Sequence, residues 1–229
     1  MSVNRRMNPF RLLPKPLKRR MFRYTPAGFS DVSSCAAFYD VRHTVFAEDD
    51  MMILEYSGLQ AQRRLFDRAT ALLPPQGRIL DLGCGLGHFL AYLDENGLPY
   101  EDYRGIDVSE RMVEKAKDRL GERFEQRDIL QSPLESGSFD TGYIVSVLGY
   151  PIGENPMKTM MEIITRCFDA CRVGIVFSHL ATGRKEGLKF TTVPQELASR
   201  CEAELGAHAR IDDDGVDFTY LLALRHESL

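Results

Sequence analysis

A glycine-rich turn directly after a short apolar run constrains this chain more than any other feature. Residues 78–82 read Arg-Ile-Leu-Asp-Leu, and glycine follows at every second position as Gly83, Gly85 and Gly87. Glycine adopts backbone torsions that other residues avoid, and it lets a ligand approach the main chain closely. The apolar residues from Phe89 onward predict a helix whose first N–H groups face the same ligand. The segment therefore predicts a strand of a parallel sheet and a turn that binds a nucleotide-like molecule.

Strand-like and helix-like segments alternate through most of the chain. Apolar spacing predicts helices over 30–39 and 51–73 ahead of the glycine turn, and Pro74 and Pro75 end the second of them. Such alternation favours right-handed crossovers and a parallel sheet with helices on both faces. The elements expected after residue 77 are strands 78–82, 103–107, 123–127, 139–146 and 172–178, and helices 87–96, 109–120, 155–170 and 194–205.

The end of the chain departs from this alternation. Two strand-like runs, 208–211 and 218–224, are separated only by the short segment 212–217. That segment is too short for a helical crossover, so the two runs are expected to pair as an antiparallel hairpin. The predicted fold class is thus α/β, with a seven-stranded and mostly parallel sheet, a C-terminal antiparallel hairpin and helices on both faces.

Charge is distributed unevenly along the 229 residues. Residues 1–30 contain eight of the 29 Lys and Arg residues and no acidic residue, which leaves 21 basic against 33 acidic residues in the remainder. We expect residues 1–29 to form a basic, partly flexible arm. A contact of this arm with nucleic acid or an anionic membrane is the alternative interpretation.

Composition is typical of a globular domain of ordinary enzyme size. Apolar residues make up 44% of the chain and charged residues 27%, and no apolar run approaches the ~20 residues of a membrane helix. No secretory signal pattern follows the basic start. The five cysteines, an odd number without framework spacing, indicate reduced thiols. These observations predict a cytoplasmic protein without a membrane span.

The spacing of the glycines separates possible ligands. A dinucleotide fingerprint needs a third glycine where His88 stands, and an acidic residue about 20 positions after the first glycine. The next acidic residue at a strand end, Asp107, lies 24 residues after Gly83. A phosphate-binding loop with Lys-Ser or Lys-Thr is absent. Neither a dinucleotide nor a nucleoside triphosphate fits this turn well.

Motifs in a fixed order resemble those of the class I S-adenosylmethionine-dependent methyltransferases. The resemblance covers residues from about 52 to 225 and implies a Rossmann-like fold, with S-adenosylmethionine as cofactor and S-adenosylhomocysteine as product. The resemblance implies that Asp107 contacts the ribose hydroxyls and that Asp128 contacts the adenine amino group. The motif segments are 79–88, 103–109, 124–129 and 139–146.

The chemistry of this cofactor agrees with the residue types. S-adenosylmethionine has no phosphate, so its site needs no lysine or arginine, and one carboxylate can accept hydrogen bonds from both ribose hydroxyls. Val108 and Ile129 would flank the adenine, and Asp81 or the backbone near it would lie close to the cationic sulfonium. The complete expected set is Tyr56, Gln60, Asp81, Gly83, Cys84, Gly85, Gly87, Asp107, Val108, Asp128, Ile129 and Ser146.

The segment before the glycine turn resembles the part of small-molecule methyltransferases that folds over the methionine end of the cofactor. Tyr56 and Gln60 stand at positions i and i+4 of the helix expected over 51–73, so they would share one face. An ordinary half-buried helix face is the alternative interpretation.

Candidate catalytic residues are His179, Tyr150 and His43. A histidine such as His179, after the fifth strand, serves some O-methyltransferases as a general base, and its ordinary pKa suits that role. Tyr150 would orient an acceptor, and His43 would come from an N-terminal lid. The sequence 146–151 lacks the Pro-Pro motif of enzymes that methylate exocyclic amines and the carboxylates of metal-dependent enzymes. We expect no metal.

These patterns predict a basic arm (1–29), a helical lid (30–76) and a methyltransferase core (77–229). A second, basic lid is expected at 182–191. The leading hypothesis is O- or N-methylation of a small metabolite or natural-product intermediate by in-line transfer. Alternatives are an RNA or protein methyltransferase tethered by the arm, an enzyme that cyclises or eliminates the aminobutyrate arm of the cofactor, and a cofactor-binding module without activity.

Overall fold

The computed structural model describes residues 27–47, 49–183, 190–214 and 218–227. Most of the expected basic arm, and the charged part of the loop expected at 182–191, lie outside the described residues. No described helix is both long enough and apolar enough to cross a membrane. All five cysteines belong to the described part of the chain, and each is a free thiol.

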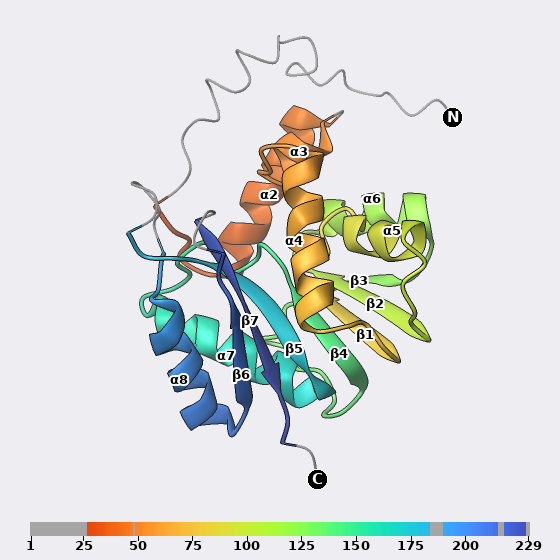
Figure 1. The fold of residues 1–229 in the computed structure, drawn as a ribbon. Helices are drawn as coiled ribbons and strands as arrows, with labels where there is room; N and C mark the ends of the chain where they lie inside the picture. Colours follow the sequence, from red (N-terminus) through yellow and green to blue (C-terminus); the bar gives the residue numbers. More distant parts are fainter. Residues whose placement is uncertain (1–26, 48, 184–189, 215–217, 228–229) are drawn as a thin grey trace, which may run out of the picture.

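A single seven-stranded sheet forms the centre of the molecule, with strand order β3-β2-β1-β4-β5-β7-β6 (Figure 1). The first five strands in the chain pair in parallel, and β7 pairs antiparallel with both β5 and β6. The predicted fold class is therefore confirmed, including the C-terminal hairpin. The strands are β1 (Arg78–Leu82), β2 (Asp102–Asp107), β3 (Phe124–Gln126), β4 (Phe139–Ile144), β5 (Cys171–Leu180), β6 (His208–Asp212) and β7 (Thr219–Arg225).

The strand order determines where a ligand can bind. The chain begins in the middle of the sheet at β1, runs outward to β2 and β3, then returns to β4 on the other side of β1. Connections therefore leave β1 and β4 in opposite directions, which opens a crevice at their carboxyl ends. The glycine turn lies in this crevice because it follows β1 directly.

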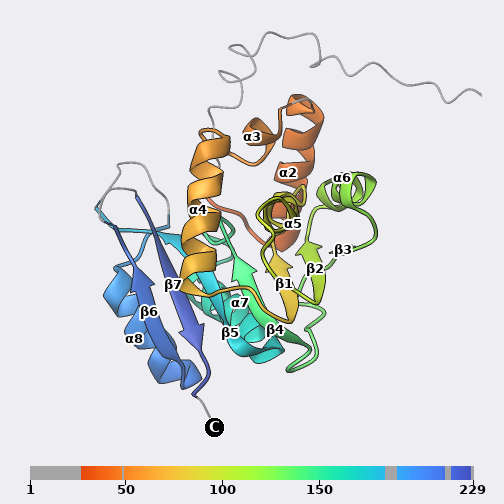
Figure 2. The same cartoon turned by 45° about the vertical axis from the view of Figure 1, so that its right-hand side comes forward.

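Helices cover both faces of the sheet, and two further helices stand over the carboxyl ends of the strands (Figure 2). These two, α2 and α3, form a lid above the arrowheads of β1, β2 and β4. The helices are α2 (Val32–Phe46), α3 (Asp50–Ile53), α4 (Leu59–Leu72), α5 (His88–Glu95), α6 (Glu110–Leu120), α7 (Pro156–Ala170) and α8 (Pro194–Leu205).

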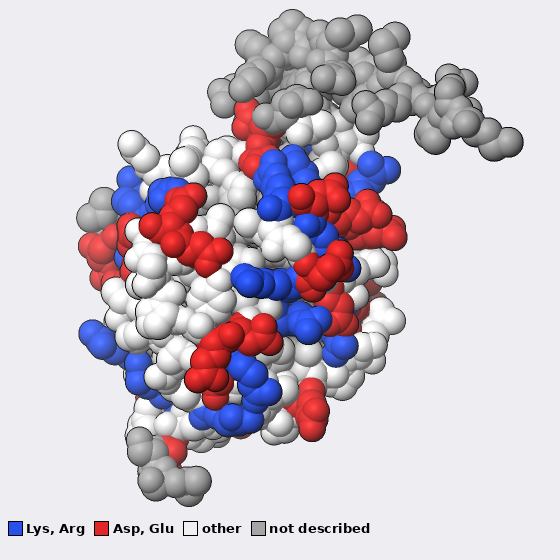
Figure 3. All heavy atoms as spheres, turned by 90° about the vertical axis from the view of Figure 1, so that its right-hand side faces the viewer, with Lys and Arg blue, Asp and Glu red and all other residues white. Residues whose placement is uncertain are grey.

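The surface that carries α5 and α6 mixes both signs of charge (Figure 3). Lysine and arginine lie between aspartate and glutamate there, and neither sign forms a continuous patch. A basic stripe is what a protein that binds nucleic acid presents. This face of the molecule therefore gives no support to a contact with nucleic acid.

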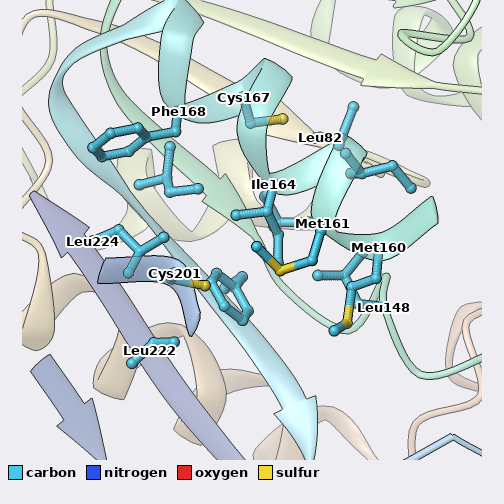
Figure 4. Packing of buried hydrophobic residues seen from close by; sticks show 14 of the residues in the cluster. Leu82, Leu148, Met160, Met161, Ile164, Cys167, Phe168, Cys201, Leu222 and Leu224 are labelled. Carbon is cyan, nitrogen blue, oxygen red and sulfur yellow. The ribbon is translucent and has the colours of Figure 1, made fainter. Parts of the chain in front are cut away.

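Two large hydrophobic clusters hold the helices against the sheet. Buried residues of α4, α5 and α6 pack on one face, together with Phe124 and Tyr143. Met161, Ile164 and Phe168 of α7 pack on the other face, toward Leu222 and Leu224 of β7 (Figure 4). Strands buried on both faces read as nearly continuous apolar runs, which explains why the sequence located them so well.

A third, smaller cluster attaches the lid to the core. Val45 and Phe46 of α2 and Ile53 of α3 are buried against Leu86 of the glycine turn and Met112 of α6. The same apolar contacts therefore position both the lid and the turn. Burial of each such side chain stabilises this arrangement by roughly 1.5–3 kcal/mol.

The expected helix over 51–73 is wrong in one respect, because the chain breaks it into two. Helix α3 ends at Ile53, Glu55 adopts a left-handed conformation with φ of 62°, and α4 begins only at Leu59. A non-glycine residue in this conformation ends a regular helix. Helix α4 then packs along the sheet face, whereas α2 and α3 lie over the strand ends. The helix expected over 30–39 continues to Phe46.

Candidate active site

The glycine turn is built for close contact between backbone and ligand. Gly83, Gly85 and Gly87 all have positive φ angles, of 72°, 52° and 80°. A Cβ atom at Gly83 would lie 2.3 Å from Cγ2 of Val147. The N–H groups of Gly83 and Cys84 bind the carbonyl of Ile106, at 2.7 and 3.1 Å, so the turn is fixed to β2. No side chain caps α5, which leaves its first N–H groups directed at the crevice.

Asp107 is fixed at the end of β2 by backbone donors. Its Oδ2 accepts from the N–H of Gly85 at 2.9 Å, and its Oδ1 accepts from the N–H of Ser109 at 2.9 Å. Burial raises the pKa of Asp107, while these backbone bonds act in the opposite direction. A carboxylate has about four acceptor positions, so two remain for a ligand. These suit the two hydroxyls of a ribose in the pocket that Asp107 lines.

The next strand supplies a matching group. Asp128 accepts from the N–H of Leu130 and from Nε2 of Gln131, both at 2.9 Å. Val108 directly follows Asp107 in the sequence, Ile129 directly follows Asp128, and both line the same pocket. Apolar side chains beside a fixed acceptor are what an adenine ring with its amino group requires. The structure thus brings the expected ribose and adenine groups to one pocket.

Asp81 lies at the deep end of the pocket and is 4% exposed. Its Oδ2 accepts a short hydrogen bond from the hydroxyl of Tyr103. Burial raises the pKa of Asp81 to about 7, although the Tyr103 bond lowers it and nearby Asp107 raises it further. A cation placed beside Asp81 would favour its ionised form.

Tyr56 and Ser146 line the pocket as expected, but Gly87 and Gln60 do not. A Cβ atom at Gly87 would instead meet Leu120 and Phe124. Tyr56 precedes α4, so Tyr56 and Gln60 share no helix face, and Gln60 is exposed. The pocket glutamine is Gln62, which is 2% exposed. Burial raises the pKa of Tyr56, and hydrogen bonds with Ser146 and Gln62 oppose that rise. Ser146 has a φ of 61°, and its N–H binds Oγ of Ser178 at 2.7 Å.

His88 and Asp50 form a connection that sequence reasoning missed. Nδ1 of His88 lies 2.8 Å from Oε1 of Gln62, and Nε2 lies 3.0 Å from Oδ2 of Asp50. Asp50 also accepts from Lys115 at 3.0 Å and from Arg119 at 2.6 Å. Although burial acts to raise it, the bonds from these three side chains lower the pKa of Asp50 well below its usual range. The sequence signal that could have indicated this connection was His88 itself, which stands where a dinucleotide-binding turn has its third glycine.

Helix α2 forms the roof of the pocket. Val32, Cys35 and Tyr39, at positions i, i+3 and i+7, line it together. Asp40 of the same helix accepts from Oγ of Ser109 at 2.5 Å, which ties α2 to the segment after β2. The chamber beneath α2 therefore adjoins the position expected for the cofactor.

The catalytic candidates lie outside this pocket. His179 is 1% exposed, packs against Phe190 and Tyr220, and its ring nitrogens have no hydrogen-bond partner among the described residues. Burial lowers the pKa of His179 to about 4. His43 does not line the pocket either, and burial together with Lys115 and Arg111 lowers its pKa. Neither histidine contacts the pocket that would hold an acceptor.

Tyr150 lies at the edge of the site. It does not line the pocket, and its hydroxyl donates to Oε2 of Glu55 at 2.8 Å. Its hydroxyl therefore contacts Glu55 and not the pocket. Among the described residues, no group of three or more His, Cys, Asp or Glu side chains has metal-binding geometry.

Comparisons with known proteins agree with this geometry. Residues 79–170 match a family model described as "Methyltransferase domain". The 27-O-demethylrifamycin SV methyltransferase of Amycolatopsis mediterranei (strain S699) is 32% identical over 172 residues, which cover 71% of this chain and 56% of that protein. The demethylmenaquinone methyltransferase of Lactococcus lactis subsp. lactis (strain IL1403) is 38% identical over 84 residues, or 34% of this chain and 32% of that protein.

A solved structure extends the likeness to most of the fold. Magnesium protoporphyrin IX methyltransferase from Synechocystis PCC 6803, with bound SAM, is 17% identical and has a TM-score of 0.60, covering 89% of this chain and all 100% of that one. Fold and motif order together define a Rossmann-like domain of the methyltransferase type. Residues 79–170 match a methyltransferase domain, and the fold around them is that of the class I S-adenosylmethionine-dependent methyltransferases. It spans about half the length of the first curated relative and a third of the second.

Proposed function

We propose that this chain transfers the methyl group of S-adenosylmethionine to an oxygen or nitrogen of a small molecule, and releases S-adenosylhomocysteine. The observation that carries this proposal is the carboxylate of Asp107, held by two backbone N–H groups with its remaining lone pairs free for the ribose. Asp128 would accept a hydrogen bond from the adenine amino group, and Asp81 would lie beside the cationic sulfonium. The residues at the strand ends fit the cofactor, and Arg127, the arginine on the pocket wall, is paired with Glu125.

The residues around the pocket act by binding, orientation and exclusion of water. The cofactor supplies an electrophilic methyl group on a positively charged sulfur. Gly83, Gly85 and the first turn of α5 hold its chain against the backbone, and Asp107 sets the ribose. Helix α2 covers the chamber where an acceptor would approach. In-line placement of a nucleophile accounts for much of such a reaction, so the burial of His179 away from the pocket does not argue against activity.

A small acceptor is favoured by the partly closed chamber under α2, because the pocket that contains it has a cavity volume of about 140 Å³. The chamber lies between this helix and the segment after β4, and residues from both line it. The curated relatives are named for rifamycin and menaquinone substrates. These names agree with a small-molecule acceptor and do not identify one for this chain.

The cofactor half of the proposal is tested by calorimetry. We expect the purified full chain to bind S-adenosylmethionine and S-adenosylhomocysteine, and to show no binding of NAD or ATP at the same concentrations. Binding of NAD in place of S-adenosylhomocysteine would overturn our placement of the ribose and adenine.

The reaction half is tested with methyl-labelled S-adenosylmethionine and extracts of small metabolites. We expect the label in a low-molecular-weight product, with S-adenosylhomocysteine formed in equal amount. Methylthioadenosine as the by-product would instead establish chemistry on the aminobutyrate arm. Label in RNA or protein would establish the macromolecular alternative.

A further inference from the structure

A carboxylate in the break between α3 and α4 joins two phenols and a guanidinium beside the pocket. Oε2 of Glu55 accepts from the hydroxyl of Tyr150 at 2.8 Å and from that of Tyr39 at 3.3 Å. Nη1 of Arg42 lies 3.4 Å from Oε1 of the same carboxylate. The groups come from α2, from the break and from the segment after β4, so the cluster closes the lid on one side.

The position of Glu55 is set by the backbone around it. Arg42 is 5% exposed, and its Nε donates to the carbonyl of Ile53 at 3.0 Å while its Nη2 donates to that of Met52. Its guanidinium lies over the ring of Phe46, 5.2 Å from the centroid. A buried guanidinium satisfied by two carbonyls holds the end of α3 rigidly. Glu55 follows this helix end closely in the chain, so its carboxylate is held beside the Tyr39 hydroxyl.

Tyr39 is the member of this cluster that faces the acceptor chamber, because it lines the pocket while Glu55 and Tyr150 do not. Cys35, one turn earlier on the same face of α2, lies between the cofactor end and the cluster. Burial raises the pKa of the Cys35 thiol to about 12, and the charges of Asp107 and Glu55 raise it further. The chamber under Tyr39 is thus continuous with the ribose site.

The bond to Glu55 determines what Tyr39 offers a ligand. Burial raises the pKa of Tyr39 well above its ordinary value, and the charge of Glu55 adds to that effect. The phenol therefore remains protonated, and it has only one proton, which it donates to Glu55. Its remaining lone pairs can only accept. A partner in the chamber must supply an O–H or N–H donor.

The charges that line the pocket limit the partner further. Among the described residues, the charged side chains on its wall are at the cofactor end. The acceptor side is bounded by Val32, Cys35, Val147 and Ile152, with Tyr39 as the polar group on the roof. An ionic group brought into this part would lose hydration and would meet no unpaired charge on the described part of the wall, because Glu55 and Arg42 behind Tyr39 are paired with each other. An uncharged, mainly apolar molecule fits it.

We propose that Tyr39 positions the methyl acceptor, and that the acceptor is an uncharged, mainly apolar molecule whose hydroxyl donates a hydrogen bond to the Tyr39 oxygen. This inference rests on the proposed methyltransferase function and names the substrate class of the same site. Glu55 is a positioning residue, since it acts through Tyr39 by holding the phenol proton away from the chamber.

The test uses the full chain saturated with S-adenosylhomocysteine, and three naphthalene probes measured by calorimetry. The probes are 1-naphthol, 1-methoxynaphthalene and 1-naphthoate, which share a ring system and differ in charge and in donor capacity. We expect 1-naphthol to bind most tightly. Tyr39→Phe should lower the affinity for 1-naphthol by about five- to tenfold, the usual effect of one hydrogen bond. It should leave the affinity for 1-methoxynaphthalene within about twofold of the parent value.

Two further variants distinguish a specific role of Tyr39 and Glu55 in positioning the probe from a general loss of structure. Tyr100→Phe removes a similar phenolic hydroxyl, which is bonded to the carboxylate of Asp94 and does not line the pocket, and it should leave the affinity for every probe unchanged. Glu55→Ala frees the Tyr39 proton to turn into the chamber, so the preference for 1-naphthol over 1-methoxynaphthalene should fall at least threefold. This ratio is insensitive to a uniform loss of affinity.

Three outcomes would overturn the inference. They are tighter binding of 1-naphthoate than of 1-naphthol, no detectable binding of 1-naphthol, and a Tyr39→Phe variant that binds 1-naphthol as the parent does. Failure of the cofactor proposal is distinguishable, because S-adenosylhomocysteine would then not bind in the first titration.

Discussion

The two ends of the pocket are built in different ways. At the cofactor end, backbone N–H groups of neighbouring strands and turns fix Asp107, and backbone and side-chain donors fix Asp128. At the lid end, side chains of separate helices bind one another, as Asp50 binds His88 and Arg119. The first arrangement exists as soon as the sheet forms. The second exists only while α2 and α3 are docked, and these helices also pack against Leu86 of the glycine turn.

Substitution of Asp107 should have the largest effect on the cofactor end. Asp107→Ala removes both hydrogen bonds expected to the ribose hydroxyls, each worth roughly 1.5–3 kcal/mol for a charged acceptor. We expect a loss of at least about 100-fold in affinity for S-adenosylhomocysteine by calorimetry. Because Asp107 also binds Gly85 and Ser109, thermal unfolding of the variant is the control. Unchanged affinity in a folded variant would show that the ribose lies elsewhere.

The pH dependence of cofactor binding should test the role of Asp81 at the cofactor end. Asp81 has a pKa raised to about 7 by burial in the free protein, so it is mostly protonated at pH 6. A nearby sulfonium favours the carboxylate, and affinity for S-adenosylmethionine should rise about tenfold from pH 6 to a plateau above pH 8. Asp81→Asn should bind more weakly at pH 8 and lose this dependence. A parent protein with flat affinity would contradict the assignment.

Stability of the free protein should change in the opposite direction. An unfolded aspartate titrates near 3.9, whereas folded Asp81 titrates near 7. The folded state therefore holds this proton more tightly, and the stability it contributes is complete below about pH 4 and is lost as the pH rises through 7. Thermal unfolding at pH 5.5 and 7.5, compared with Asp81→Asn, measures this contribution.

The lid end should respond more weakly. Asp50→Ala removes the acceptor shared by His88, Lys115 and Arg119 and loosens α3 from α5 and α6. We expect about a fivefold loss in affinity for S-adenosylhomocysteine, mainly through faster dissociation, because the lid would open more often. Hydrogen exchange should speed up in α2 and α3 and stay unchanged in β1 and β4. Equal acceleration throughout would mean that Asp50 stabilises the whole fold.

The residues predicted for the cofactor end lie mostly in one pocket, because the sequence signals for them are local. Gly83, Gly85 and Asp107 stand beside the strands that position them, so a strand prediction and a motif place them together. Strand ends in a parallel sheet meet at one edge, and that rule supplied the long-range information. The strands and the terminal hairpin followed from apolar runs and segment lengths for the same reason.

The lid end was not accessible in this way. Glu55 adopts a left-handed conformation just after α3 ends, and the local signal near the break, Ser57-Gly58, also fits a glycine inside a helix. The break moved Gln60 to the surface and brought Gln62 into the pocket. The bond between Glu55 and Tyr150 joins residues 95 positions apart, and that between Asp50 and Arg119 joins residues 69 apart. Such pairs depend on how α2 and α3 dock, which no local pattern encodes.

The place of the lid in the chain has a consequence for synthesis on the ribosome. Helix α2 is made before the sheet, yet its buried residues Val45 and Phe46 pack against Leu86 and Met112, which are translated much later. Until α6 has emerged, these two side chains have only Ile53 of α3 and the glycine turn beside them in that cluster, and the rest of their apolar surface remains available to chaperones. The nascent protein must therefore complete the first strands and their glycine turn before α2 can fold over them.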